Sequence, residues 1–254
     1  YAHTFPRMQA KTEAYYRRYP GDIERVAAVA DALEGSTATL PDGSPLTVER
    51  LQLLGSDFGM KPSFERMHWL FDHAFEDLDG SSLGAGAPEL SEGFLMSVLE
   101  RTNTCANPLY WTLQEFIYAS GTCAPINWAA AAEKAHRHEF DTLARPLLFT
   151  GEAAFPWMFE ECPFAAAMDE LMRDTEFDAV YDPARLAANE TPVHAAVYFD
   201  DMYVDSGLQL DTLSRVGNAH PWVTNEFEHD GLRAGTSVFQ HLYEEARQMG
   251  HLAR

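Results

Sequence analysis

The spacing of apolar residues changes once along this chain, near residue 185. Before that point apolar side chains recur every three to four positions, as in Ile23 to Leu33 and Phe64 to Phe75. This period predicts amphipathic helices. After that point, Val193 to Phe199 is a run of β-branched and aromatic residues that follows a Thr-Pro pair. Such a run predicts a buried strand.

The remaining pattern predicts a helix over Leu208 to Val216, a strand over Trp222 to Phe227, and an amphipathic helix over Leu232 to Met249. This alternation of strands and helices is typical of parallel pairing. Two strands do not form a stable sheet alone, so we expect further strands upstream of Tyr1. The fold class predicted is therefore α/β, with a mostly helical region over 1–185 and a strand–helix–strand–helix region over 186–254.

Charge and cysteine content narrow the partners and the cellular location. The chain has 18 basic and 39 acidic residues, a net charge of −21, and no run long enough to span a membrane. Nucleic acid binding needs a basic surface, so neither a nucleic acid nor a membrane is an expected partner. The three cysteines form no CxxC pair and no zinc spacing, which favours reduced thiols and a cytoplasmic location. The chain opens on Tyr1 without a methionine, which is typical of a processed or truncated chain.

Polar groups with catalytic potential follow both predicted strands. Asp200 and Asp201 end the first strand, and His229 follows the second, 28 residues after Asp201. A serine hydrolase uses a histidine to deprotonate the serine and a buried aspartate to orient that histidine. Asp201 and His229 have the chain order of the last two members of such a triad. Asp200 and Asp205 compete for the acid role, and the plainer alternative is a capping aspartate and a surface histidine.

The sequence offers no convincing nucleophilic serine to complete the triad. Gly80 to Gly84 matches the GxSxG pattern around Ser82, but acidic residues precede it and a Gly- and Ala-rich stretch follows it. A nucleophile elbow needs a strand before the serine and a helix after it. We therefore interpret the nucleophile as absent from this chain. An alternative use of Asp200 to Asp205, as the magnesium motif of a class I terpene synthase, lacks the second metal motif and the helical pattern.

Carboxylates also occur inside two strongly aromatic stretches, Leu109 to Tyr118 and Gly151 to Glu161. Aromatic residues at this spacing are usually core. A carboxylate among them needs a partner, and a substrate ammonium would serve. The candidate acids are Glu115, Glu152 and Glu160.

Several segments resemble the prolyl aminopeptidases (proline iminopeptidases) of the α/β-hydrolase superfamily. They are Thr4 to Met8, Tyr15 to Pro20, Tyr181 to Glu190, Ala195 to Asp205 and Glu228 to Leu232. The resemblance extends along the whole chain but covers only the C-terminal part of the family's length. The stretch Tyr198 to Met202 resembles the family's strand end that carries the triad acid, which points to Asp201, and Glu228-His229 resembles its histidine loop.

The resemblance implies a helical cap over 1–185 and the C-terminal part of the hydrolase core over 186–254. It implies a peptide substrate with a free N-terminal proline, whose nitrogen the cap glutamates hold and whose ring contacts aromatics. The residues expected there are Glu152, Glu115, Glu160, Phe155 and Trp157. The family's oxyanion segment and serine lie upstream of this chain, so the expected partner is an N-terminal hydrolase fragment that carries the serine. No metal or organic cofactor is implied.

Two other functions remain open from the sequence. One is an esterase or amidase of the same fold, which would use the same Asp201 and His229 on a neutral substrate. The other is a non-catalytic helical binding protein, which would be folded and monodisperse without a serine-bearing partner.

Overall fold

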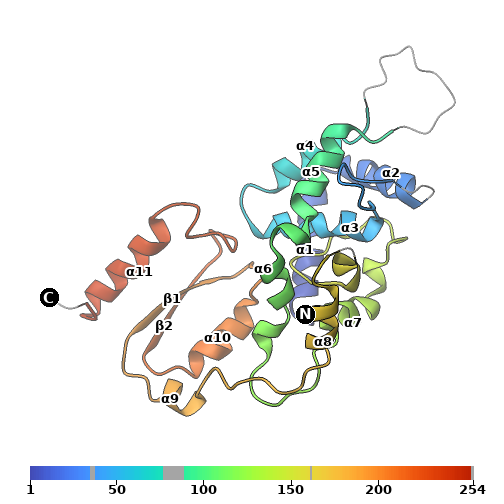
Figure 1. The fold of residues 1–254 in the computed structure, drawn as a ribbon. Helices are drawn as coiled ribbons and strands as arrows, with labels where there is room; N and C mark the ends of the chain where they lie inside the picture. Colours follow the sequence, from blue (N-terminus) through green and yellow to red (C-terminus); the bar gives the residue numbers. More distant parts are fainter. Residues whose placement is uncertain (35–37, 77–88, 161, 253–254) are drawn as a thin grey trace. The chain divides into compact units, whose positions relative to one another are not determined.

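The structure is a computed structural model of the 254-residue chain, and it describes residues 1–34, 38–76, 89–160 and 162–252. The chain divides into two compact units, each traceable by colour in Figure 1. The first unit comprises Tyr1–Phe58, Pro62–Ala119 and Pro125–Asp174. The second comprises Gly59–Lys61, Ser120–Ala124 and Thr175–Arg254. The assignment of 1–185 to a cap and 186–254 to a hydrolase core stays a prediction.

The first unit is built from helices joined by short 3-10 segments, as the apolar spacing predicts. Its helices are α1 (Thr4–Arg18), α2 (Asp22–Glu34), α3 (Val48–Gln52), α4 (Phe64–Asp72), α5 (Glu92–Thr102), α6 (Pro108–Leu113), α7 (Ala129–Ala135) and α8 (Ala165–Leu171). The apolar spacing also predicts a helix over Ile126 to Ala135, but α7 begins only at Ala129, because Asn127 and Trp128 have positive φ angles of 47° and 60°. It predicts a further helix over Phe155 to Glu160, where the structure has a 3-10 turn, Pro156–Phe159.

Aromatic rings from distant parts of the sequence form the core of this unit. The ring centroids of Tyr15 and Phe58 are 5.2 Å apart, those of Phe58 and Phe149 are 5.6 Å apart, and those of Phe71 and Phe149 are 5.8 Å apart. All four side chains are buried. Edge-to-face and tilted contacts at these distances stabilise a core beyond the area they bury.

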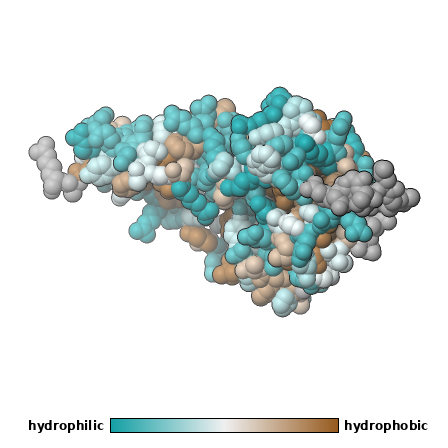
Figure 2. Space-filling model, turned by 90° about the horizontal axis from the view of Figure 1, so that it is seen from above, coloured by the Kyte–Doolittle hydropathy of each residue, from teal (hydrophilic) through white to brown (hydrophobic). Residues whose placement is uncertain are grey.

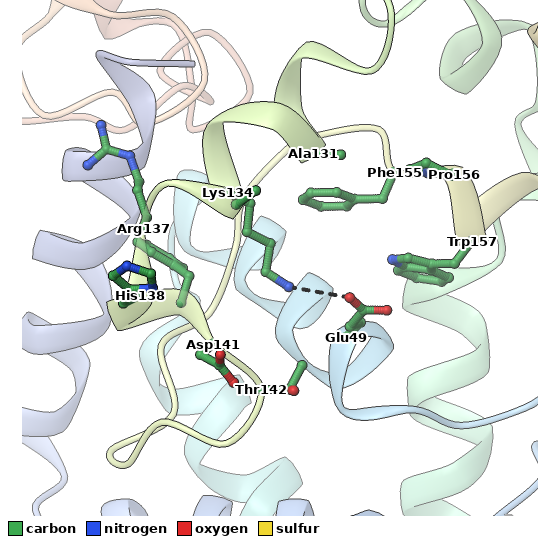
Figure 3. A pocket seen from close by; sticks show the side chains of 12 residues that line it. Glu49, Ala131, Lys134, Arg137, His138, Asp141, Thr142, Phe155, Pro156 and Trp157 are labelled. Atoms are coloured by element: carbon green, nitrogen blue, oxygen red, sulfur yellow. Dashed lines mark ion pairs between the residues drawn. The ribbon is translucent and has the colours of Figure 1, made fainter.

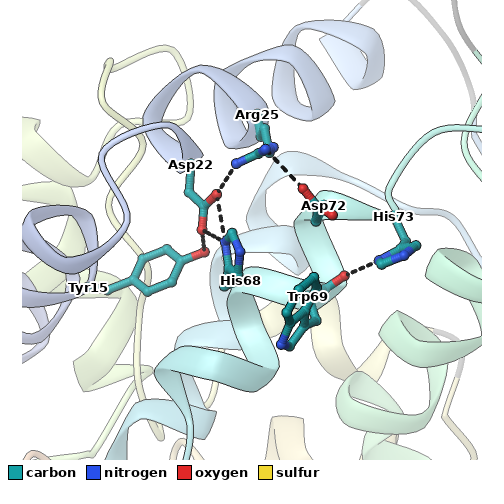
Figure 4. Close-up of polar contacts among 7 residues, drawn as sticks. All are labelled: Tyr15, Asp22, Arg25, His68, Trp69, Asp72 and His73. Carbon is teal, nitrogen blue, oxygen red and sulfur yellow. Dashed lines mark hydrogen bonds and ion pairs between the residues drawn. The ribbon is translucent and has the colours of Figure 1, made fainter.

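A buried carboxylate joins α1, α2 and α4 (Figure 4). Asp22 accepts hydrogen bonds from the phenol of Tyr15 at 2.5 Å and from the guanidinium of Arg25 at 2.7 Å, and its Oδ2 lies 3.0 Å from Nδ1 of His68. Arg25 also contacts Asp72 at 2.9 Å. Burial, and then the hydrogen bond to Asp22, raise the pKa of Tyr15 above its usual range. Asp22 is thus a fully buried charge with a cation and two further polar partners, as burial of a charge requires.

The second unit contains a two-stranded parallel sheet, which agrees with the predicted pairing. Strand β1 (Val193–Tyr198) pairs with β2 (Ala219–Thr224) in a register that places Val193 beside Ala219 and Tyr198 beside Thr224. In Figure 1 the strands run between α10 (Ser206–Ser214) and α11 (Ser237–Gln248), and α9 (Pro183–Ala187) precedes them. Helix α10 packs on both strands and α11 packs on β1.

Three expectations about this unit need correction. β2 begins at Ala219 rather than Trp222 and so includes Pro221. Within the described residues β2 pairs with β1 along one edge, and an edge strand tolerates a proline because the missing N–H can face away from the partner. α11 begins at Ser237 rather than Leu232, after Gly235 turns the chain with a φ of 150°. β1 was expected to be buried, but in this chain only Val197 of its six residues is buried.

The cysteines also differ from the expectation of reduced thiols. Cys105 and Cys162 form a disulfide across 57 residues, with their Cα atoms 6.0 Å apart. Cys123 is a free thiol of intermediate exposure. The sequence gives no signal for this pair, because the two cysteines approach only when the segment after α5 packs beside the 3-10 turn Pro156–Phe159.

The surface is mixed in polarity. On the face drawn in Figure 2, hydrophilic residues predominate and apolar residues lie in patches between them, in keeping with the net charge of −21. None of the helices in the described ranges combines the length and apolar character that crossing a bilayer requires.

Candidate active site

Asp201 and His229 are brought together by the parallel sheet of the second unit. Asp201 follows β1 and His229 follows β2, and the carboxyl ends of parallel strands meet at the same sheet edge. The Nδ1 of His229 lies 2.9 Å from Oδ2 of Asp201. Two residues 28 positions apart in the sequence therefore form one hydrogen-bonded pair.

The carboxylate of Asp201 is buried, and both of its oxygens take part in hydrogen bonds. Its side chain is 3% exposed, and its Oδ1 accepts the backbone N–H groups of Tyr203 at 2.8 Å and Val204 at 3.0 Å. Each oxygen of this buried carboxylate thus has a hydrogen-bond donor, as a buried charge requires. The two backbone bonds also fix the direction in which Oδ2 faces the imidazole.

The imidazole of His229 is 41% exposed, in contrast to its buried partner. Beside an anionic carboxylate, Nδ1 carries the proton and Nε2 is the basic nitrogen of the neutral ring. The ring of Tyr203 lies 5.1 Å from the imidazole, centroid to centroid, and covers part of it. The pair has the geometry that a general base and its orienting acid require.

The two competing aspartates have other surroundings. Asp205 is buried and caps α10, because its Oδ1 accepts the N–H of Leu208 at 2.9 Å. Asp200 is exposed. Of these three carboxylates, Asp201 is the one that lies within hydrogen-bond distance of the imidazole.

Glu115 lies in the first unit, where it has partners of its own. It is 1% exposed, and its two oxygens accept the N–H groups of Ala129 at 3.1 Å and Ala130 at 2.9 Å, which start α7. Burial raises the pKa of the Glu115 carboxyl, and the two backbone hydrogen bonds oppose that shift. The burial of Glu115 therefore needs no substrate ammonium to explain it.

The charges of Glu152 and Glu115 both act on one group, the phenol of Tyr1. The pKa of the Tyr1 phenol is raised above its usual range, first by burial, then by the charge of Glu115 and, less strongly, by that of Glu152. Glu152 itself is partly exposed. Two acids of the predicted amine site are thus electrostatic neighbours.

Phe155 and Trp157 line one cavity of about 310 Å³, and Figure 3 shows that Lys134 and Glu49, joined as an ion pair, lie in the same cavity. The ammonium of Lys134 lies 2.8 Å from the Gln52 side-chain oxygen, 3.7 Å from a Glu49 oxygen and 5.6 Å from the Phe155 ring centroid. Burial lowers the pKa of Lys134. The two aromatics predicted for the proline ring therefore share a cavity with a cation, which the sequence did not predict.

Glu160 is exposed and lines a separate cavity of about 540 Å³, together with Trp157 and the disulfide. Trp157 thus borders both cavities, whereas Glu152 is not among the residues lining either. The structure brings the five predicted substrate residues into one unit but not around one cavity.

Comparison with known proteins finds two relatives of similar sequence. No protein-family model matches the chain. The chain is 36% identical over 251 residues to a proline iminopeptidase of Aeromonas sobria, which covers 95% of this chain and 56% of that protein. It is 32% identical over 233 residues to the proline iminopeptidase aneH of Aspergillus aculeatus, covering 89% of this chain and 50% of that protein. Over most of its length the chain is therefore similar to part of two proline iminopeptidases.

The chain spans about half the length of the curated relatives it matches. Relatives of this family imply an α/β-hydrolase fold, and a parallel strand pair with flanking helices is consistent with part of one. Ser82, the only serine here in a GxSxG pattern, lies outside the described residues. Within the described ranges, no cluster of three or more His, Cys, Asp or Glu residues is arranged to hold a metal ion.

Sequence reasoning missed several residues around the pair. Tyr203 is adjacent to the predicted strand end and Asp230 is adjacent to His229, so both lie in motifs that had been singled out. Gly59–Lys61 carries no sequence signal of its own, and it joins the second unit only in three dimensions.

Proposed function

We propose that this chain is the cap and C-terminal core portion of a serine hydrolase that releases N-terminal proline from peptides. Similarity to two proline iminopeptidases supports the reaction class. The observation that carries the proposal is the hydrogen bond between a buried Asp201 and an accessible His229 at the ends of neighbouring parallel strands. The nucleophilic serine lies upstream or on another chain in this proposal.

The reaction follows from the roles of the pair. The serine attacks the carbonyl of the N-terminal residue, and Nε2 of His229 takes the serine proton. His229 then gives that proton to the leaving amine as the acyl-enzyme forms, and water completes the cycle through the same imidazole. The Asp201 carboxylate keeps the required tautomer and stabilises the imidazolium that forms in each half-reaction. No step needs a metal or an organic cofactor.

Substrate selection rests on charge in this proposal. Glu152, with Glu115 and Glu160, provides negative charge for the substrate's free imino nitrogen, and Phe155 and Trp157 contact the proline ring. The charges of Glu115 and Glu152, which both raise the pKa of the Tyr1 phenol, support the first part. The shared cavity of Phe155 and Trp157 supports the second. A blocked N-terminus would lose the charge interaction and should be a poor substrate.

The test is Glu152→Gln in the full-length protein, assayed on proline-β-naphthylamide and on a neutral ester. We expect kcat/KM for the naphthylamide to fall about 10- to 100-fold, because one charge-assisted contact with the substrate is lost, while the ester rate stays within about twofold. Glu170→Gln is the matched control, since Glu170 is a glutamate of the same unit that is 82% exposed. Equal losses on both substrates would contradict the amine-site role.

A second measurement locates the nucleophile. Fluorophosphonate labelling and intact mass of the native preparation should place the label on a serine outside residues 1–254. A label on Ser82 would overturn the proposal.

A further inference from the structure

The histidine loop of the second unit is held by a segment from far upstream. Three hydrogen bonds join residues 59–61 to residues 226–230. The N–H of His229 donates to the carbonyl of Gly59 at 3.0 Å. The N–H of Lys61 donates to Oδ2 of Asp230 at 3.0 Å, and the ammonium of Lys61 donates to the carbonyl of Glu226 at 2.8 Å. The loop is therefore fixed before, at and after His229.

The same segment approaches the ring that covers the imidazole. A Cβ at Gly59 would lie 2.3 to 2.7 Å from atoms of the Tyr203 ring, which is closer than packed atoms can be. Tyr203 in turn lies 5.1 Å from His229 and donates its N–H to Asp201. Gly59 thus has a role that only a residue without a side chain can fill, because its backbone lies directly against the ring.

Burial supports a specific role for Asp230. Asp230 is 8% exposed, so its carboxylate is largely removed from water, and it accepts a hydrogen bond from the Lys61 N–H. The pKa of the Tyr198 phenol is raised, first by burial and then by the charges of Asp201 and Asp230. The charges of Asp230 and Asp201 thus both act on Tyr198, the last residue of β1, while Asp230 accepts from the Lys61 N–H and Asp201 contacts the imidazole.

We infer that Gly59–Lys61 and Asp230 form a clamp that positions His229 for proton transfer, with Asp230 as its main positioning residue. This inference rests on the proposed function for its catalytic meaning. The clamp fixes the backbone of His229, whereas Asp201 fixes the direction of its ring. Misplacing a catalytic group by about 1 Å can cost about 100-fold in rate, so a loosened clamp should lower turnover without changing substrate affinity.

The decisive variant is Asp230→Ala in the full-length protein, which removes the acceptor of the Lys61 N–H. We expect kcat for proline-β-naphthylamide to fall about tenfold per folded molecule, with KM within about twofold. Asp230→Asn keeps an oxygen acceptor at the same place and should restore most of the rate. Asp178→Ala is the control, because Asp178 is an exposed aspartate of the same unit.

Two further variants test the other contacts. Lys61→Met removes the bond to the Glu226 carbonyl and should lower kcat about threefold, as one of three contacts is lost. Gly59→Ala should displace Tyr203 and lower kcat more than Lys61→Met does. Gly93→Ala is its control, since a Cβ there would meet no atom within 4 Å.

A readout independent of turnover separates positioning from stability. Histidine-selective ¹⁵N NMR of the full-length protein should show the His229 ring signals shifted or broadened in Asp230→Ala and restored in Asp230→Asn. A lower Tm with unchanged His229 signals and unchanged kcat would overturn the clamp. If His229→Ala and Asp201→Asn keep full activity, the proposed function fails instead, and the NMR comparison still decides whether the clamp positions the ring.

Discussion

Two buried aspartates in this chain each contact the Nδ1 of a histidine, one in each unit. Asp22 lies 3.0 Å from Nδ1 of His68, and Asp201 lies 2.9 Å from Nδ1 of His229. By this distance alone the pairs are equivalent. Their surroundings differ in ways that bear on chemistry.

The charge of Asp22 is neutralised by Arg25, and the ring of its partner His68 is covered by Tyr19. Arg25 supplies a cation and Tyr15 a phenol, while the His68 ring is stacked on Tyr19 at 4.1 Å and its side chain is 18% exposed. Asp201 instead receives backbone N–H groups, and His229 is 41% exposed. The comparison teaches that an Asp–His hydrogen bond becomes a candidate proton relay when backbone N–H groups, rather than an arginine, satisfy the carboxylate and the imidazole is accessible.

The largest expected effect is on turnover, from Asp201→Asn in the full-length protein. The amide would donate to the imidazole and favour the wrong tautomer, so we expect kcat to fall about 10³- to 10⁴-fold. The measurement is steady-state hydrolysis of proline-β-naphthylamide, with Asp22→Asn as the matched control. A similar loss per folded molecule in Asp22→Asn would break the distinction between the pairs.

The next effect is on stability, from Asp22→Ala. This change leaves Arg25, Tyr15 and His68 without their shared acceptor in a buried site, so the free energy of unfolding should fall about 3 kcal/mol. Urea denaturation measures it. Glu24→Ala, an exposed acid in the same first turn of α2, should change stability by less than about 0.5 kcal/mol. A small effect of Asp22→Ala would show that its network contributes little.

The smallest effect concerns pH and a third carboxylate–imidazole pair. The Nδ1 of His194 lies 2.9 Å from Glu245, its Nε2 lies 3.0 Å from Nδ1 of His251, and the His220 ring is 4.8 Å from the His251 ring. Desolvation, and then the charges of His220 and His194, lower the pKa of His251, whereas Glu245 opposes the shift.

Because the folded-state pKa of His251 lies below its ordinary value, the unfolded chain binds the proton more readily. The stabilising contribution is therefore present above the ordinary histidine pKa of about 6.5 and is lost as the pH falls below it. Thermal unfolding between about pH 8 and pH 5 should show a shallower loss of Tm in His251→Asn than in the unmodified protein. Parallel profiles would contradict a role for this histidine cluster.

The local sequence predicted those elements whose residues strongly favour one secondary structure. The β-branched run from Val193 predicted β1, and the polar residues after both strands predicted which groups would meet at the sheet edge. The start of β2 was not predicted because it contains Pro221. Proline has no N–H to donate, so a sequence pattern with proline favours a strand only at the edge of a sheet. The parallel pairing followed from the order of the elements alone.

Contacts between distant residues could not be predicted in the same way. Nothing in the sequence marks Asp22 for His68, which lies 46 residues later, or Cys105 for Cys162. Glu115 was identified correctly as an acid in an apolar stretch, but its partners are the N–H groups of α7. Such pairs depend on tertiary packing, which has no periodic signature in the chain.

The clamp around His229 also affects the order in which parts of the chain can fold during synthesis. The Lys61 N–H and its Asp230 acceptor are separated by 169 residues, and closing so long a loop is entropically costly and slow. During synthesis, residues 59–61 leave the ribosome long before their partners exist. The helical unit can therefore begin to fold while the histidine loop is still untranslated, and the geometry around His229 is completed only after Asp230 has been synthesised.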